Sequence, residues 1–112
     1  MNTMNEEINI FKVLDFIRDN AKKYAKAKAD RVYIEEFRKS KKALLYQESP
    51  AGTIAEKEAY AYAHKDYQEL LDGLRVAVEQ EEGLRWQIEA AKLKAEVWRS
   101  LEANKRVEAK IV

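Results

Sequence analysis

The stretch YQELLDGLRVAVEQEEGLRWQIEAAKLKAEVW (67–98) decides the fold of this 112-residue chain. Apolar residues return along it in alternating steps of three and four, the heptad spacing of a coiled-coil or helix-bundle seam. The seam consists of Tyr67, Leu70, Leu74, Ala77, Glu81, Leu84, Ile88, Ala91, Ala95 and Trp98. Glu81 is its polar exception, and we interpret it as a register-setting or salt-bridged residue. The pattern predicts a long helix over about 65–107.

The N-terminal part of the chain predicts another long helix, over about 5–47, opened by a Thr3-x-x-Glu6 capping box. The segment VYIEEF (32–37) has strand-like residues, but its flanks are helix formers without turn residues, so helix is favoured. The expected buried stripe follows a 3.6-residue period with alanines in its middle. It comprises Leu14, Ile17, Ala21, Ala25, Ala29, Val32, Glu36, Ala43 and Tyr46, widened at its ends by Phe11, Tyr33, Phe37 and Leu44.

The one clear break lies at 48–53, which holds the only Pro of the chain. A second capping box, Thr53-x-x-Glu56, predicts a short helix over about 54–63. A kink is expected near His64 to Asp66, with Asp66 as the cap of the following helix. Two long helices joined by a short break favour an antiparallel hairpin. We therefore expect an all-α, coiled-coil-like hairpin with a short intervening helix, forming a single domain over 1–112.

Composition points to self-assembly. Charged residues make up 37% of the chain and hydrophobic residues 46%, which suits elongated helices that bury narrow stripes. Its large aromatic residues cannot all lie on one side of a two-helix hairpin, so we expect an oligomeric bundle. Trp86, beside Arg85, suggests a second packing surface between subunits; ordinary core is the alternative. The residues expected at an oligomer or partner interface are Leu74, Leu84, Trp86, Ile88 and Trp98.

Charge is distributed unevenly around a net value of +1. Residues 18–42 hold ten Lys or Arg and four acids, whereas 48–89 hold ten acids and four Lys or Arg. One interpretation is that the two halves complement each other when the helices pack. The other is a phosphate-binding surface on the basic 22–42 face, which would contact nucleic acid weakly and without reading its sequence. Its densest cluster is Arg38, Lys39, Lys41 and Lys42.

No residue set for catalysis is apparent. The chain has no Cys and one His, His64, so neither a thiolate nucleophile nor a typical zinc site is expected. Three scattered Gly form no phosphate-binding loop. Acid pairs such as Glu79 with Glu82 lack the Glu-x-x-His pattern of carboxylate-bridged metal sites. We expect a protein that is not an enzyme and needs no cofactor or metal.

The chain shows neither a signal-peptide pattern at its start nor an apolar stretch long enough to span a bilayer. These features favour a soluble cytoplasmic protein and give no reason to expect a membrane partner.

Two stretches carry a family resemblance: RVYIEEFRKSKKALL (31–45) and AYAHKDYQELLDGLRVAVEQEEGLRWQIEAAKLKAEVWRSLEANKR (61–106). They resemble small helical proteins of unknown function encoded in the early and recombination region of tailed phages and prophages of Gram-negative bacteria. The distinctive elements are Leu84-Arg85-Trp86 and Glu96-Val97-Trp98-Arg99. The resemblance implies a phage-encoded protein in the cytoplasm of a bacterial host. It also implies an accessory role in DNA recombination or replication, as an oligomeric adaptor that contacts a protein of that process.

Overall fold

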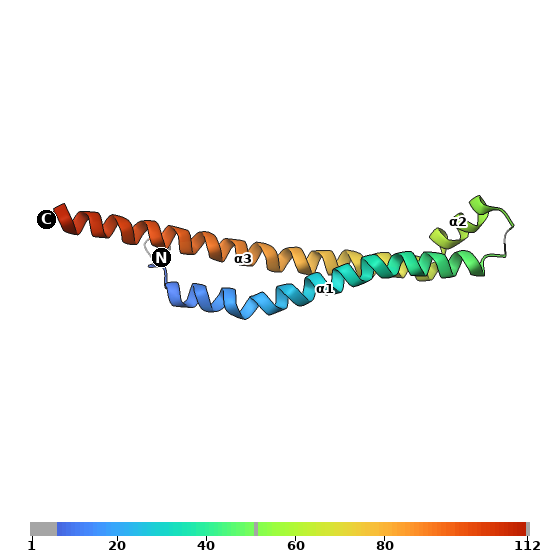
Figure 1. The fold of residues 1–112 in the computed structure, drawn as a ribbon, viewed down its shortest axis with the longest axis horizontal. Coiled ribbons are helices and arrows are strands. Elements are labelled where there is room, and N and C mark those ends of the chain that lie inside the picture. Colours follow the sequence, from blue (N-terminus) through green and yellow to red (C-terminus); the bar gives the residue numbers. More distant parts are fainter. Residues whose placement is uncertain (1–6, 51, 112) are drawn as a thin grey trace, which may run out of the picture. The chain divides into compact units, whose positions relative to one another are not determined.

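The computed structural model describes residues 7–50 and 52–111 and confirms the all-α class. Three helices follow one another along the chain: α1 (Ile10–Glu48), α2 (Ile54–Ala63) and α3 (Lys65–Ile111) (Figure 1). No strand occurs in the described parts of the chain, and the segment 32–37 is helical. The sequence predicted these helices over about 5–47, 54–63 and 65–107.

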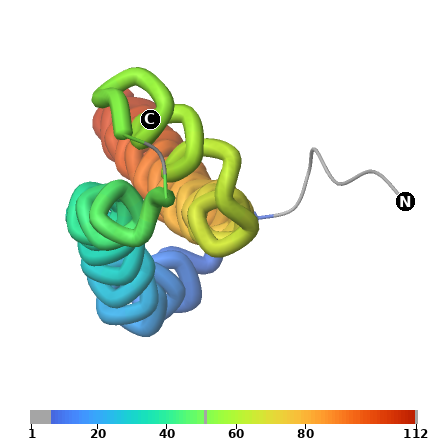
Figure 2. Tube along the Cα trace, turned by 90° about the vertical axis from the view of Figure 1, so that its right-hand side faces the viewer, coloured from blue at the N-terminus to red at the C-terminus, as the bar shows by residue number. Residues whose placement is uncertain are grey.

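The chain divides into two compact units, and the single domain over 1–112 stays a prediction. Unit 1 joins the N-terminal part of the chain up to Tyr24 with the part that starts at Gly83, and unit 2 is Ala25–Glu82. The described residues of unit 1 therefore come from α1 and α3, whereas unit 2 also contains α2. Figure 2 views the helices nearly end-on and shows the three helical segments of unit 2 side by side.

Side-chain caps determine where the helices begin. Asn9 caps α1, because its Oδ1 accepts from the backbone N–H of Lys12 at 3.2 Å. The expected capping box of Thr3 and Glu6 lies outside the described residues. Thr53 caps α2: its backbone is extended and its Oγ1 accepts from the N–H of Glu56 at 3.2 Å. The second capping pattern in the sequence predicted this contact.

His64 forms the junction between α2 and α3, within the segment His64 to Asp66 where the sequence predicted a kink. The cap of α3 is His64, not Asp66 as the sequence predicted. The Nδ1 atom of His64 accepts from the N–H of Asp66 at 3.0 Å, and its carbonyl accepts from the N–H of Gln68 at 3.1 Å. Gln68 in turn donates from its side chain to the carbonyl of Tyr62 at 2.7 Å. One histidine thus ends α2 and caps α3, and Asp66 belongs to the first turn of α3.

The heptad seam predicted on α3 is confirmed, because all ten of its residues are buried or half-buried. In unit 2, Tyr67 of this seam packs with Leu45 of α1 and Ala61 of α2, and Leu71 packs against this cluster. Ala61 is fully buried and Leu45 is 1% exposed, so the three helices of unit 2 meet most tightly here.

The stripe predicted on α1 is wrong. Leu14, the three central alanines, Val32, Glu36 and Ala43 are exposed, and so are the four residues expected to widen the stripe. The buried and half-buried row instead follows a heptad: Val13, Ile17, Asn20, Tyr24, Ala27, Arg31, Ile34, Arg38, Lys41 and Leu45. Four of its members are polar or charged, so a search for apolar periodicity does not find it. Long basic side chains occupy such positions because their aliphatic stems cover apolar surface.

Candidate functional site

The best-defined polar contact of unit 2 joins Arg31 of α1 to Glu81 of α3. Arg31 Nε lies 2.7 Å from Glu81 Oε1, and Arg31 Nη2 lies 3.0 Å from Glu81 Oε2, which makes the pair bidentate. Arg31 Nη1 also donates to Glu35 Oε2 at 2.9 Å. Hydrogen bonds to Glu81 and to Glu35 raise the pKa of the Arg31 guanidinium above its ordinary value. The prediction that Glu81 is salt-bridged is confirmed.

This contact is structural in character. The Glu81 side chain is 8% exposed, whereas that of Arg31 is 23% exposed and that of Glu35 is 40% exposed. A buried carboxylate needs a cation and aligned donors to remain ionised at low cost, and Arg31 supplies both. Within the described part of the chain, no group of three or more His, Asp or Glu is arranged to hold a metal ion.

An apolar groove lies on unit 2 between α1 and α3. Its volume is about 360 Å³. The lining residues are Asp30, Tyr33, Ile34, Gly73, Val76, Ala77 and Gln80. The rings of Tyr33 and Phe37 are stacked at 6.1 Å and nearly parallel, yet Tyr33 is 69% exposed. We call the seven lining residues, together with Phe37, the aromatic groove. The sequence had assigned Tyr33 and Phe37 to the core, so their exposed positions were missed.

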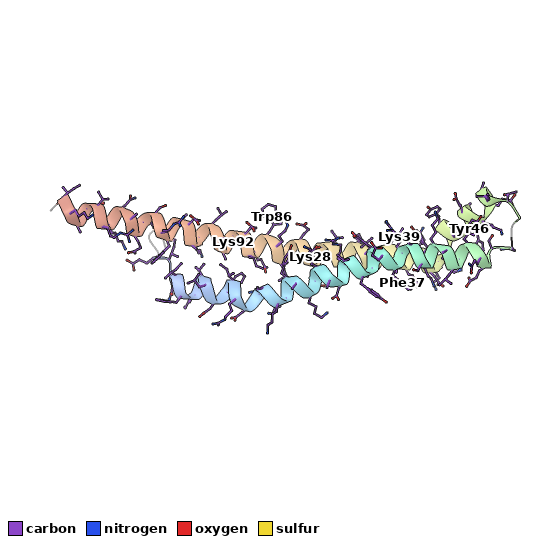
Figure 3. All side chains as sticks on the ribbon, viewed as in Figure 1. Lys28, Phe37, Lys39, Tyr46, Trp86 and Lys92 are labelled. Carbon is purple, nitrogen blue, oxygen red and sulfur yellow. The ribbon has the colours of Figure 1, made fainter. Side chains whose placement is uncertain are left out.

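A second groove of unit 2 is basic and lies between α1 and α2. It has a volume of about 390 Å³. The lining residues are Lys39, Lys42, Ala43, Tyr46, Gln47 and Glu58. Lys42 Nζ lies 4.5 Å from the centre of the Tyr62 ring. A side-chain hydrogen bond with Tyr62 raises the pKa of the Lys42 ammonium. Figure 3 labels Lys39 and Tyr46 on this part of α1. We call this set the basic groove.

The four residues expected to contact nucleic acid are not equally accessible. Arg38 is half-buried, and Lys41 is 27% exposed because its Nζ lies 3.5 Å from Asp66 Oδ2. Lys39 is well exposed, with its Nζ 3.4 Å from Glu36 Oε2. The structure therefore brings only Lys39 and Lys42 together in a groove, and intramolecular contacts engage both of them.

Unit 1 has a groove of its own, about 320 Å³ in volume. It lies between the first turns of α1 and the middle of α3. The lining residues are Lys12, Val13, Phe16, Gln87, Ala90, Ala91 and Lys94. One lysine from each helix flanks its mainly apolar lining.

The residues expected at an interface fall into two groups. Leu74, Leu84, Ile88 and Trp98 belong to the seam and are half-buried within the chain. Trp86 is 61% exposed, and its side chain stands out from α3 in Figure 3. The guanidinium of Arg85 lies 4.5 Å from the centre of the Trp86 ring. Of the five, Trp86 is the one that presents most of its surface to a possible partner.

Comparison with known proteins adds no relative: no protein-family model, no curated protein and no solved structure matches the chain. Within its described residues, none of the helices is long and apolar enough to cross a membrane.

Proposed function

We propose that this chain is a non-enzymatic helical adaptor that assembles with copies of itself and docks a second protein. The observation that carries the proposal is the amount of large apolar surface left exposed. Seventeen large hydrophobic residues are exposed on the described helices. Contiguous apolar surface beyond a few hundred Å² marks interaction sites in soluble proteins. Aromatic residues such as Tyr33 and Trp86 are the types that contribute most to binding energy at interfaces.

The proposal includes an antiparallel hairpin of α1 and α3. Contacts in unit 2 support it, because Arg31 pairs with Glu81 whereas the later residue Lys41 pairs with the earlier residue Asp66. Within unit 1, the groove that brings Lys12 and Lys94 together follows the same order. Such a hairpin leaves the outer faces of its helices open to other proteins.

Sedimentation of the purified chain tests the self-assembly. We expect a mass of at least two chains at micromolar concentration, because exposed Trp86 and its neighbours would otherwise remain in water. Trp86→Glu places a charge on that surface and is expected to shift the protein toward monomer. Ala59→Glu, which adds a carboxylate at an exposed residue of α2, is the matched control. A wild-type chain that sediments as a monomer at all concentrations contradicts the proposal.

The resemblance to phage proteins directs the search for the docked protein. We propose that it acts in DNA recombination or replication and that it binds at the aromatic groove. Binding of a purified phage annealing or exonuclease protein is expected to weaken when Tyr33→Ala and Phe37→Ala are combined. Arg75→Ala, on α3 and outside the groove residues, is the control. Equal binding by both variants contradicts this assignment of the groove.

A weak, non-specific nucleic-acid-binding function is the alternative, and the basic groove favours it. Lys39 and Lys42 lie beside Tyr46, with Glu58 on the same lining, and basic side chains beside an aromatic ring are a common way to hold single strands. Charge reversal of Lys39 and Lys42, the two of the four expected residues that line the groove, is expected to weaken salt-dependent binding to random single-stranded DNA. Absence of wild-type binding at low salt eliminates this alternative.

A further inference from the structure

α3 carries a second apolar row in unit 1, on the side opposite to its seam. From Trp86 onward the row advances by four and three residues in strict alternation. Its members are Trp86, Ala90, Leu93, Val97, Ser100, Asn104, Val107 and Ile111, and every one is exposed. Each member lies two residues after a position of the seam, or after Glu102, Lys105 or Ala109, which continue the same heptad spacing. Because each helical residue turns by about 100°, the two rows face in opposite directions. We call this set the outer row.

The outer row is exposed along unit 1, although Ala90 lines the edge of the groove between α1 and α3. Ala91 of the seam lines the same groove, so α1 lies to one side of the outer row. Leu93 is 67% exposed and Ile111 is 80% exposed, although both are among the most apolar residue types. As far as Ala103, α3 has its seam packed and the outer row in water, whereas beyond it Lys105 and Ala109 of the seam's continuation are exposed as well. A second heptad row of mainly apolar residues can pack against a second helix.

We propose that the outer row joins two copies of the chain as a parallel, in-register, two-stranded coiled coil over about residues 86–111. The inference rests on the proposed self-assembly and names its geometry. The order of residue types supports it: the a positions hold Ala90, Val97, Asn104 and Ile111, and the d positions hold Trp86, Leu93, Ser100 and Val107. β-branched residues at a with Leu at d favour parallel dimers, and Val97 and Ile111 at a with Leu93 at d are the members that follow this preference.

Asn104 supplies a second argument for this occupant. It is the one amide side chain in the outer row, and it stands at an a position. A single Asn at a fixes both register and two-strandedness, because its amide then meets the same amide of the second helix. A shifted or antiparallel partner would bury this amide against an apolar side chain and leave its hydrogen bonds unmade.

Charge complementarity fits a second copy of the chain as the occupant. Glu89 and Lys94 flank the outer row at the g position of one heptad and the e position of the next. In a parallel dimer, g of one helix faces the following e of the other, so Glu89, which accepts from Lys92 Nζ at 3.2 Å within the chain, also meets Lys94 of the second copy. An antiparallel dimer of the same segment would place Glu89 opposite Lys110, which is attractive as well, so the parallel direction rests on Asn104.

Cysteine cross-linking tests the geometry, because the chain has no Cys of its own. We expect Ala90→Cys and Val107→Cys, each tested alone, to form disulfide-linked dimers under mild oxidation at micromolar concentration. The two positions are about 26 Å apart at 1.5 Å per residue, so an antiparallel dimer would cross-link at one of them at most. Lys92→Cys, exposed on α3 and outside both rows, is the matched control and is expected to remain largely uncross-linked.

A charge exchange tests the pairing independently. Lys94→Glu is expected to raise the dimer dissociation constant about tenfold, because two attractive pairs become repulsive. The double variant Glu89→Lys/Lys94→Glu restores the pairing with reversed signs and is expected to recover wild-type association. A wild-type monomer in sedimentation overturns both the self-assembly and this inference. A stable oligomer that lacks cross-links at Ala90→Cys and Val107→Cys overturns only the parallel geometry.

Discussion

Glu81 places a carboxylate on the inward side of α3, where an unpaired charge would be costly. Arg31 meets both of its oxygens, and Glu35 takes a further hydrogen bond from the same guanidinium. A bidentate contact of this kind tolerates little displacement along the helix axis, because the fork of Arg matches the carboxylate in one orientation. The pair therefore holds α1 and α3 in one register within unit 2.

Removal of the carboxylate alone is expected to be more damaging than removal of the whole pair. Glu81→Leu should lower the free energy of unfolding by about 1–3 kcal/mol, because a half-buried cation loses its main partner. The double variant Arg31→Leu/Glu81→Leu should recover most of that loss, since apolar side chains of similar size pack on the same row. Urea unfolding measures both variants. Independent, additive losses would show that the two residues do not interact.

At the scale of helices, α1 is distinguished by the face that it buries. Apolar content alone favoured the alanine-rich side, whereas the structure buries a row one position away that includes Asn20, Arg31, Arg38 and Lys41. The neighbouring residues Leu44 and Leu45 show the difference most clearly. Leu45 is 1% exposed in the cluster with Ala61 and Tyr67, and Leu44 is 52% exposed.

These two adjacent leucines provide a matched test of which face is buried. Leu45→Ala is expected to lower the free energy of unfolding by about 2–5 kcal/mol, because it leaves a cavity where three helices meet. Leu44→Ala changes the same residue type one position away and is expected to alter stability by less than about 0.5 kcal/mol. Thermal or urea unfolding compares them directly. Equal effects would indicate that the buried face of α1 has been assigned to the wrong side.

Burial in the molecule as a whole is sparse for its length. Only six of the described residues are buried, and one of these is Glu81. Folding free energy arises mainly from buried apolar surface, so the proposed self-assembly would supply a large share of the stability of such a chain. In unit 1, the exposed residues of the outer row are the surface whose burial in a dimer would supply this stability.

Thermal unfolding is expected to depend on protein concentration for this reason. A folded dimer is stabilised by mass action, so Tm should rise when the concentration is raised, for example from 2 to about 200 μM. Leu93→Glu places a charge in the outer row and is expected to remove this dependence. Scanning calorimetry at several concentrations provides the measurement. A wild-type Tm that does not change with concentration argues against assembly at the folding step.

The amino-acid sequence by itself determined the all-α class, the position of the break, the cap at Thr53 and the seam of α3. These features depend on interactions within a few residues, such as a capping hydrogen bond or a heptad of apolar side chains. The buried face of α1 and the partner of Glu81 were decided only by the tertiary structure. A half-buried arginine or lysine is identical in sequence to an exposed one, and only the neighbouring helix determines which of them it becomes.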